Sequence, residues 1–246
     1  MSNLGFHLPD AETSPAVGDY VGDYNDNGGR RRGSPGRTRR RFSRERLAIV
    51  AGLVLWGTGI AGGFVYAMLY EITPATSDVA GNHWPAATSC SLTRQHPTLV
   101  LFVHPHCPCS RATLNELSVL MTHCEGRLAA HVLFYKPGSA TTQWTRTDLW
   151  HAADRIPGVQ TRVDVDGAER RHFGARVSGE VFLYQASGEL AFHGGITASR
   201  GHAGDNAGRS AIESLVLNHA ATASTTPVFG CELQDSDAVP GSECCR

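Results

Sequence analysis

The stretch FVHPHCPCSRATLNEL, residues 102–117, joins the end of an apolar strand to two cysteines and the start of a helix. The apolar run at residues 98–103 predicts a buried strand. Ser110 is the expected N-cap of the helix, so Cys107 and Cys109 lie between the two elements. Because the unpaired N–H groups at a helix N-terminus stabilise a thiolate, this arrangement favours thiol chemistry.

The hydrophobic pattern after residue 97 predicts an alternation of strands and helices, and the 246 residues, 41% of them hydrophobic, suffice for a packed core. Alternating elements that end in a hairpin and a helix are typical of a three-layer α/β domain with a central mixed sheet. We expect helices at residues 112–124, 147–155, 167–173 and 207–219, the last capped by Asp205 or Asn206, and further strands at residues 129–135, 159–166, 181–184 and 190–193.

Residues 47–70, LAIVAGLVLWGTGIAGGFVYAMLY, contain no charged side chain. As a helix they extend about 36 Å, which is enough to cross a hydrocarbon core of about 30 Å. An arginine-rich run at residues 30–46 precedes them, and the positive-inside rule places such a run in the cytoplasm. We therefore expect a single-pass protein of the bacterial inner membrane, with its N-terminus cytoplasmic and its C-terminal domain periplasmic.

The export route stays open between two alternatives. Residues 38–44, TRRRFSR, are similar to a twin-arginine signal, whereas the apolar span alone suits the Sec route. No small-x-small cleavage motif follows the span, which favours a retained anchor over a cleaved signal.

Composition divides the rest of the chain. Residues 1–46 are rich in Gly, Asp, Arg, Pro and Ser and are expected to be a disordered cytoplasmic tail whose arginines set topology and do not bind nucleic acid. We expect a linker at residues 71–96, the α/β domain at residues 97–231 and a cysteine-containing tail at residues 232–246.

The chain contains seven cysteines, and the periplasm permits disulfides. Cys124 falls on the apolar face of its helix and is expected to be an inert buried thiol. Cys90 can pair with Cys231, Cys244 or Cys245, and the vicinal Cys244 and Cys245 can also pair with each other or bind a metal. An odd number leaves at least one thiol unpaired or paired between molecules.

The strand, cysteine loop and helix at residues 98–124, together with the hairpin VSGEVFLYQASGEL at residues 177–190, resemble the thioredoxin-like fold. The resemblance covers residues 97–220 and points to the membrane-anchored TlpA and RedB-like branch. It implies a thiol–disulfide site at the N-terminus of the first long helix of the domain.

The resemblance assigns the cysteine motif in two ways. The family's Cys-x-x-Cys corresponds either to His106 and Cys109 or to Cys107 and Ser110. The family's cis-proline, which helps to dock substrate and keeps metals away from the cysteines, falls on Gly179. This departure leaves metal binding more open than in the family.

The loop that enters the last helix lies near the cysteines in thioredoxin-like folds. The resemblance therefore implies that Arg200 and His202 cover the site and bind a partner. The alternative is a glycine-rich surface loop without a binding role.

We favour thiol–disulfide exchange with extracytoplasmic protein thiols through Cys107 and Cys109, without a cofactor. The two thiols can pair with each other, or one can attack while Cys231 resolves the mixed disulfide. His104 and His106 flank the site and can favour a thiolate or accept its proton.

Two other hypotheses remain open. Sulfur and imidazole ligands suit Cu(I) or Zn(II), so His104, His106, Cys107 and Cys109 can form a metal-binding or metal-delivery site. Alternatively, the domain is redox-inactive and serves only in protein interaction.

Overall fold

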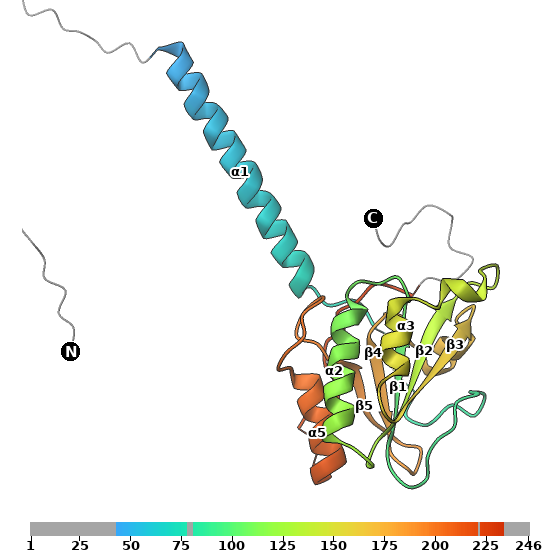
Figure 1. The fold of residues 1–246 in the computed structure, drawn as a ribbon. Coiled ribbons are helices and arrows are strands. Elements are labelled where there is room, and N and C mark those ends of the chain that lie inside the picture. The colour runs from blue at the N-terminus through green and yellow to red at the C-terminus, as the bar shows by residue number, and fades with distance from the viewer. Residues whose placement is uncertain (1–42, 78–80, 221, 234–246) are drawn as a thin grey trace, which may run out of the picture. The chain divides into compact units, whose positions relative to one another are not determined.

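The computed structural model describes residues 43–77, 81–220 and 222–233. By its contacts the chain divides at residue 50, and the second unit, residues 51–246, carries the sheet (Figure 1). The elements in chain order are α1 (Arg44–Ile72), β1 (Thr98–Val103), α2 (Ser110–His123), β2 (Ala129–Lys136), the 3-10 helix η1 (Thr142–Trp144), α3 (Asp148–Asp154), β3 (Val159–Val165), α4 (Ala168–Phe173), β4 (Glu180–Tyr184), β5 (Leu190–Gly195) and α5 (Ala207–Asn218).

The five strands form one mixed sheet in the order β3-β2-β1-β4-β5. β1 pairs in parallel with β2, and β2 in parallel with β3, whereas β4 is antiparallel to both β1 and β5. All six residues of β1 are buried, as a strand with neighbours on both sides and a layer on each face requires. The loop after β1 therefore begins at the centre of the sheet edge.

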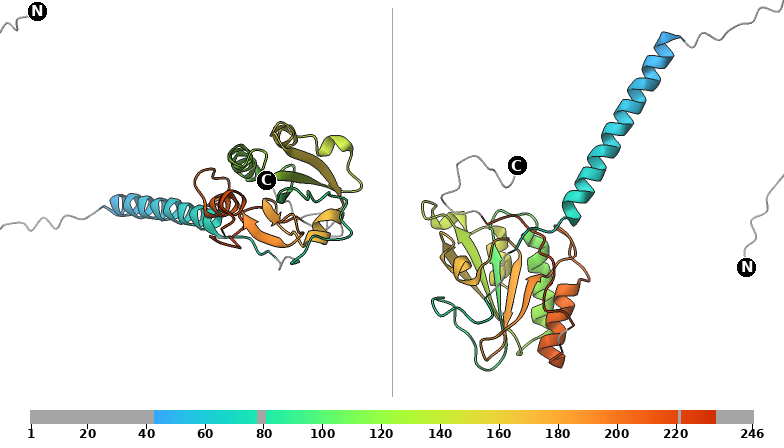
Figure 2. Two further views of the ribbon diagram at one scale, coloured as in Figure 1. Left: turned by 90° about the horizontal axis from the view of Figure 1, so that it is seen from below. Right: turned by 180° about the vertical axis from the view of Figure 1, so that it is seen from behind.

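Each face of the sheet is covered by its own apolar cluster, which confirms the expected three-layer α/β architecture. On one face, side chains such as Leu101 and Phe134 pack against α2, α3 and α5. On the other face, Phe102 and Tyr184 pack against Phe173 of α4. The two further views in Figure 2 show the helices on either side of the sheet.

Within the domain, the observed ends of the helices and strands agree with the predicted ends to within two residues. The predicted N-cap of α2 is wrong. Ser110 is not the N-cap of α2; that position is Cys109, which has no side-chain capping bond. The loop itself supplies the acceptors, because the carbonyls of Cys107, Pro108 and Cys109 receive the amide hydrogens of residues 110, 111 and 112. The hydroxyl of Ser110 is thereby available for the site described below.

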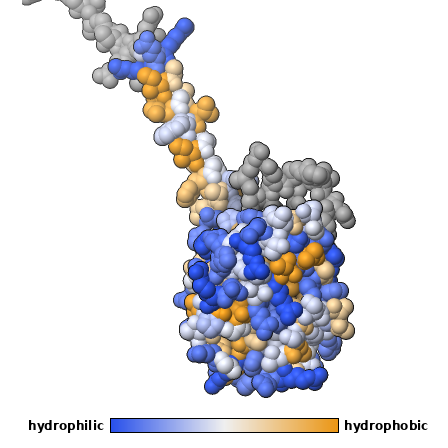
Figure 3. Space-filling view, turned by 45° about the vertical axis from the view of Figure 1, so that its right-hand side comes forward, coloured by the Kyte–Doolittle hydropathy of each residue, from blue (hydrophilic) through white to orange (hydrophobic). Residues whose placement is uncertain are grey.

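One described helix, α1, is long and apolar enough to span a membrane by its length and composition. Its most apolar 18-residue stretch has a mean hydropathy of 1.9, and none of the 29 residues of the helix is buried within the structure. Figure 3 shows apolar side chains along this helix, and it shows a mostly polar surface on the side of the domain that is turned toward the viewer.

Residues 81–96 of the expected linker pack against the domain. Trp84 lies edge-on to Phe173 and Tyr184, with ring centroids 5.4 and 5.2 Å apart. The backbone of His83 bridges to Glu189 in the β4–β5 hairpin, and Cys90 is buried in the same cluster. This segment extends the layer that covers the α4 face of the sheet.

The close packing of α5 on β5 depends on Gly208. A Cβ at this position would lie 1.9 Å from the carbonyl oxygen of Gly195. Replacing an exposed helical glycine by alanine stabilises a helix by about 1 kcal/mol, but a clash with a backbone atom in a packed core outweighs that gain.

We therefore predict that Gly208→Ala lowers the stability of the full-length protein by about 1–3 kcal/mol. Thermal unfolding of the detergent-solubilised protein, followed by circular dichroism, measures this change. Ser210→Ala in the same helix is the control and should leave the melting temperature nearly unchanged. A melting temperature of Gly208→Ala equal to or above that of the wild type would show that α5 does not pack this closely.

Candidate functional site

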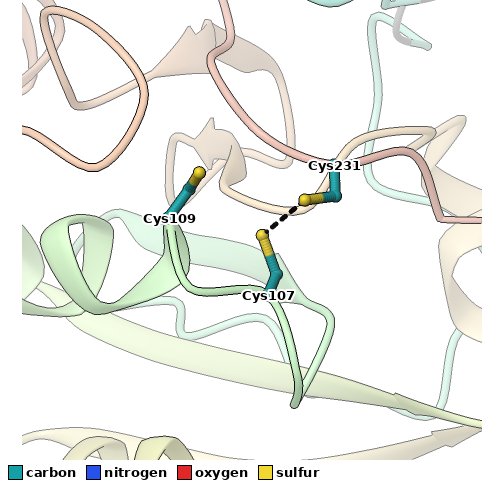
Figure 4. A group of neighbouring side chains, drawn as sticks. All are labelled: Cys107, Cys109 and Cys231. Carbon is teal, nitrogen blue, oxygen red and sulfur yellow. Dashed lines mark hydrogen bonds between the residues drawn. The ribbon is translucent and has the colours of Figure 1, made fainter. Parts of the chain in front are cut away.

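Three cysteine thiols from two distant parts of the chain converge at the edge of the sheet where β1 ends. Cys107 and Cys109 lie in the loop between β1 and α2, and Cys231 lies in the C-terminal segment (Figure 4). All three sulfur atoms lie within 4.8 Å of one another. The Sγ atoms of Cys107 and Cys231 are 2.9 Å apart and share a hydrogen bond, although 124 positions separate them in the sequence.

The C-terminal segment is held against the loop that precedes β4. The amide of Ser178 donates a 2.8 Å hydrogen bond to the carbonyl of Cys231, and Val177 bridges to Glu232. This approach requires a glycine at position 230, because a Cβ there would lie 1.7 Å from the carbonyl oxygen of Ser178. The backbone therefore fixes the position of Cys231 relative to the cysteine loop.

Ser178 also connects the loop before β4 to the cysteine loop. Its Oγ accepts a 2.8 Å hydrogen bond from the amide of His104 and lies 2.8 Å from the Oγ of Ser110. Ser110 and Ser178 are both buried. The pair of hydroxyls positions the start of α2 against the segment that carries Cys231.

Gly179, which the resemblance aligned with the family's cis-proline, has a φ of +96°. Proline fixes φ near −65°, so the conformation at this position excludes it. The amide of Gly179 donates a 2.8 Å hydrogen bond to the carbonyl of Phe102, a bond that proline cannot make. The backbone beside the cysteines therefore adopts a conformation at position 179 that glycine permits and proline does not.

The neighbouring thiols make Cys107 the favoured thiolate. Hydrogen bonds from Cys109 and Cys231 lower the pKa of Cys107, against the opposing effect of burial, and Ser110 adds a further bond. The pKa of Cys109 is raised, chiefly because its thiol donates to Cys107. The site thus holds one stabilised thiolate beside a thiol that retains its proton.

The exposure of the three thiols differs. Cys107 is completely buried and Cys231 is 9% exposed, whereas Cys109 at the N-cap of α2 is partly exposed. A bulky partner can therefore reach Cys109 more readily than the other two.

The two other described cysteines lie within the apolar clusters. Burial raises the pKa of Cys124 to about 11 and also raises the pKa of Cys90. Both thiols are therefore protonated and unreactive near neutral pH. Cys244 and Cys245 lie outside the described residues.

The two histidines of the loop do not join the sulfur cluster in the described part of the chain. Nδ1 of the half-buried His104 accepts a 3.2 Å hydrogen bond from the amide of His106, and burial lowers the pKa of His104. The exposed His106 packs edge-on to Trp144, with ring centroids 4.7 Å apart. The structure therefore places a third sulfur, not an imidazole, beside Cys107 and Cys109.

Of the two residues expected to cover the site, Arg200 reaches it and His202 does not. The guanidinium of Arg200 donates to the carbonyl of Gly230, next to Cys231, and its charge acts to lower the pKa of Cys109. His202 is exposed, and its Nδ1 contacts the carbonyl of Arg200. A hollow of about 330 Å³ beside Arg200 is lined by Tyr70, Pro74, Ala75, Thr76, Arg200, Gly230, Cys231 and Glu232.

A buried ionisable pair that the sequence analysis did not single out supports the loop before β4. Oε1 of Glu180 lies 2.6 Å from Nε2 of His193, and Oε2 accepts hydrogen bonds from the amides of Arg176 and Val177. Glu180 is completely buried. An acidic residue directly before the apolar run at residues 181–184 was the signal that could have indicated this role.

No protein-family model and no curated protein matches the chain. Among solved structures, an uncharacterised conserved protein from Geobacillus kaustophilus is 12% identical, with a TM-score of 0.49 over 68% of this chain and 95% of that chain. A hypothetical protein from Sinorhizobium meliloti 1021 is 20% identical, with a TM-score of 0.48 over 65% and 93% of the two chains. A thioredoxin-like superfamily protein is 17% identical, with a TM-score of 0.37 over 61% and 98%.

The strand order, the strand directions and the helix that follows the cysteine loop make this domain thioredoxin-like in fold.

The proximity of Cys107 to Cys231 predicts that oxidation joins these two residues. A disulfide that closes a loop of this length stabilises a protein by about 4–5 kcal/mol through the unfolded state. In a background of Cys244→Ser and Cys245→Ser, the oxidised protein should therefore melt at a higher temperature than the reduced protein. Cys231→Ser should abolish this difference and Cys109→Ser should preserve it. The opposite pattern would show that Cys107 pairs with Cys109.

The hydrogen bonds to Cys107 predict a thiolate that persists below the ordinary thiol pKa. Absorbance near 240 nm of the reduced protein should report one thiolate throughout the range from pH 6 to 8. A lowered pKa in the folded state also means that this thiolate adds stability above the ordinary thiol pKa, and that the gain is lost as pH falls through the lowered pKa. Cys109→Ser and Cys231→Ser should each raise the midpoint of the absorbance change, whereas Cys90→Ser should not. A wild-type midpoint near that of a free thiol would contradict the described site.

Proposed function

We propose that this protein is a membrane-anchored thiol–disulfide exchange protein that acts on extracytoplasmic protein thiols. The observation that carries the proposal is the 2.9 Å separation of the Cys107 and Cys231 sulfurs, with Cys109 beside them, at the end of the central strand of a thioredoxin-like sheet. A pair of thiols this close can form a disulfide with little backbone movement.

Cys109 is the thiol that meets the substrate in this proposal, because it is the most exposed of the three. Attack begins when the proton of the Cys109 thiol passes to the Cys107 thiolate, a transfer that runs against the order of their pKa values and makes Cys109 the nucleophile. The Cys109 thiolate then attacks one sulfur of a substrate disulfide. The S–S bond of the substrate breaks, and its other sulfur leaves as a thiolate. That thiolate takes the proton from Cys107, which restores the Cys107 thiolate.

The substrate is then released by two internal exchanges. Cys107 attacks the sulfur of Cys109, and the second substrate sulfur leaves as a thiolate, which takes a proton from water. Cys231 next attacks Cys107, forms the Cys107–Cys231 disulfide and returns Cys109 to the thiol state. The substrate has gained two electrons from Cys107 and Cys231. It has also gained two protons, one from the protein and one from water, because Cys107 began as a thiolate. The reverse sequence transfers a disulfide to a substrate dithiol.

The anchor places this chemistry at a membrane surface. We propose that α1 spans the bacterial inner membrane once, with the arginine-rich tail in the cytoplasm and the domain in the periplasm, as in the TlpA and RedB-like branch. The arginine run, the apolar span and a compartment that permits disulfides support this topology. Protein thiols and the lipid bilayer are the partners in this proposal, and nucleic acid is not.

The order of attack predicts how much thiol an aromatic disulfide reagent releases. In a background of Cys244→Ser and Cys245→Ser, the reduced protein mixed with one equivalent of reagent should release two equivalents of aryl thiol, because an internal thiol displaces the adduct. The double variant Cys107→Ser with Cys231→Ser should release one equivalent and keep the other on Cys109, where peptide mass spectrometry locates it.

Cys90→Ser is the matched control and should behave as the wild type, since Cys90 is a buried thiol outside the site. Cys109→Ser should react much more slowly than the wild type. An undiminished rate in Cys109→Ser would overturn the assigned order of attack, and failure of the wild type to release the second equivalent would favour a redox-inactive domain.

A further inference from the structure

We propose that the reduced protein binds one monovalent copper ion through the thiolates of Cys107, Cys109 and Cys231. The three sulfur atoms form a cluster in which every pair lies within 4.8 Å, so one ion can contact all three after small side-chain movements. This binding needs only the reduced thiols, and it is independent of whether the protein exchanges disulfides.

The number and type of ligands favour Cu(I) over other metals. Thiolates are soft ligands that select Cu(I), and hard cations such as Mg²⁺ and Ca²⁺ require oxygen ligands. Structural zinc sites almost always have four ligands, and this cluster contains three in the described chain. The hydrogen bond that His104 Nδ1 accepts from the amide of His106 holds that nitrogen within the loop, away from a role as the fourth ligand.

The surroundings offset the charge of the site. Three thiolates and one monovalent cation leave a net charge of about −2, which a buried position cannot hold without compensation. The N-terminus of the 14-residue helix α2 supplies the positive end of its dipole at Cys109. Arg200 supplies a full positive charge that acts on Cys109 and donates to the carbonyl next to Cys231.

The arrangement also provides access and protection. Cys107 and Cys231 are buried, which shields a bound ion from water, whereas Cys109 is partly exposed. The hollow of about 330 Å³ beside Cys231 and Arg200 opens next to the cluster. A small carrier or a ligand from a partner protein can therefore reach the ion from the side of Cys109 or from this hollow.

Copper binding and disulfide formation exclude each other. When a substrate disulfide takes two electrons from Cys107 and Cys231, these two sulfurs become a disulfide and one thiolate ligand remains. The copper stays monovalent in this step, because the thiolates supply both electrons. The oxidised protein should therefore release the ion.

The test is an anaerobic titration of the full-length reduced protein with Cu(I) against bicinchoninate, a coloured chelator. Cys244→Ser and Cys245→Ser form the background, which removes the competing thiols of the tail. We expect one copper per chain and an X-ray absorption spectrum with three sulfur neighbours and no nitrogen. Chemical oxidation to the Cys107–Cys231 disulfide should transfer the copper to the chelator.

Variants separate the three-sulfur site from the histidine-containing alternative. Cys107→Ser, Cys109→Ser and Cys231→Ser should each weaken binding at least about tenfold, since even outer-shell changes cost a metal site that much. Cys90→Ser, His104→Ala and His106→Ala should bind as the wild type does. Thermal unfolding of each metal-free variant identifies any variant that does not fold. For such a position, the X-ray absorption spectrum of the wild-type protein alone identifies the ligands.

Three results would overturn the proposal: a stoichiometry other than one, nitrogen in the absorption spectrum, or unchanged affinity in folded Cys231→Ser. Uptake of zinc in preference to copper would overturn it as well. The release of aryl thiol by metal-free protein reports on disulfide exchange separately, so failure of copper binding and failure of the proposed exchange remain distinguishable.

Discussion

The close approach of the C-terminal segment to the loop before β4 is the contact on which the site depends. Gly230 lies against the carbonyl of Ser178 at a separation that no larger residue permits, and Ser178 in turn bonds the carbonyl of Cys231. The same serine bonds the amide of His104 and the hydroxyl of Ser110. One residue thus links the strand end, the start of α2 and the segment that carries the third cysteine. Without this contact the chain would retain Cys107 and Cys109 in the loop but would have no third cysteine beside them.

The chemistry follows from a balance between burial and hydrogen bonding. Burial alone would raise the pKa of Cys107, as it does for Cys124 in the core. At Cys107 the thiols of Cys109 and Cys231 donate hydrogen bonds that outweigh burial and lower the pKa. The result is a protected thiolate beside an accessible thiol, an arrangement that suits both exchange with a disulfide and binding of a soft metal ion. The redox state of Cys107 and Cys231 decides which of the two is available.

The sequence predicted the sheet and its helices well, because buried strands such as residues 98–103 and amphipathic helices such as α5 have clear hydrophobic periods. It also indicated the cysteine loop, whose position between a strand and a helix is a local feature. It named Cys231 as the candidate resolving cysteine but could not establish its contact with Cys107, because proximity across 124 positions depends on tertiary packing. An acidic residue in an amphipathic helix normally lies on its exposed face, yet Glu116 of α2 is buried and bonds Arg209 and Asn206 of the segment at α5. Hydrophobic periodicity cannot distinguish an exposed acid from one that is buried with a partner supplied by a distant helix.

The most direct test of the central claim is a redox titration of the three thiols. The full-length protein is equilibrated across dithiothreitol buffers of defined potential without metal, then alkylated, and the modification of Cys107, Cys109 and Cys231 is followed by peptide mass spectrometry. The account predicts one reversible two-electron transition in which Cys107 and Cys231 lose their thiols together while Cys109 remains reduced. Thiols at Cys107 and Cys231 that never oxidise, or that oxidise at unrelated potentials, would contradict it.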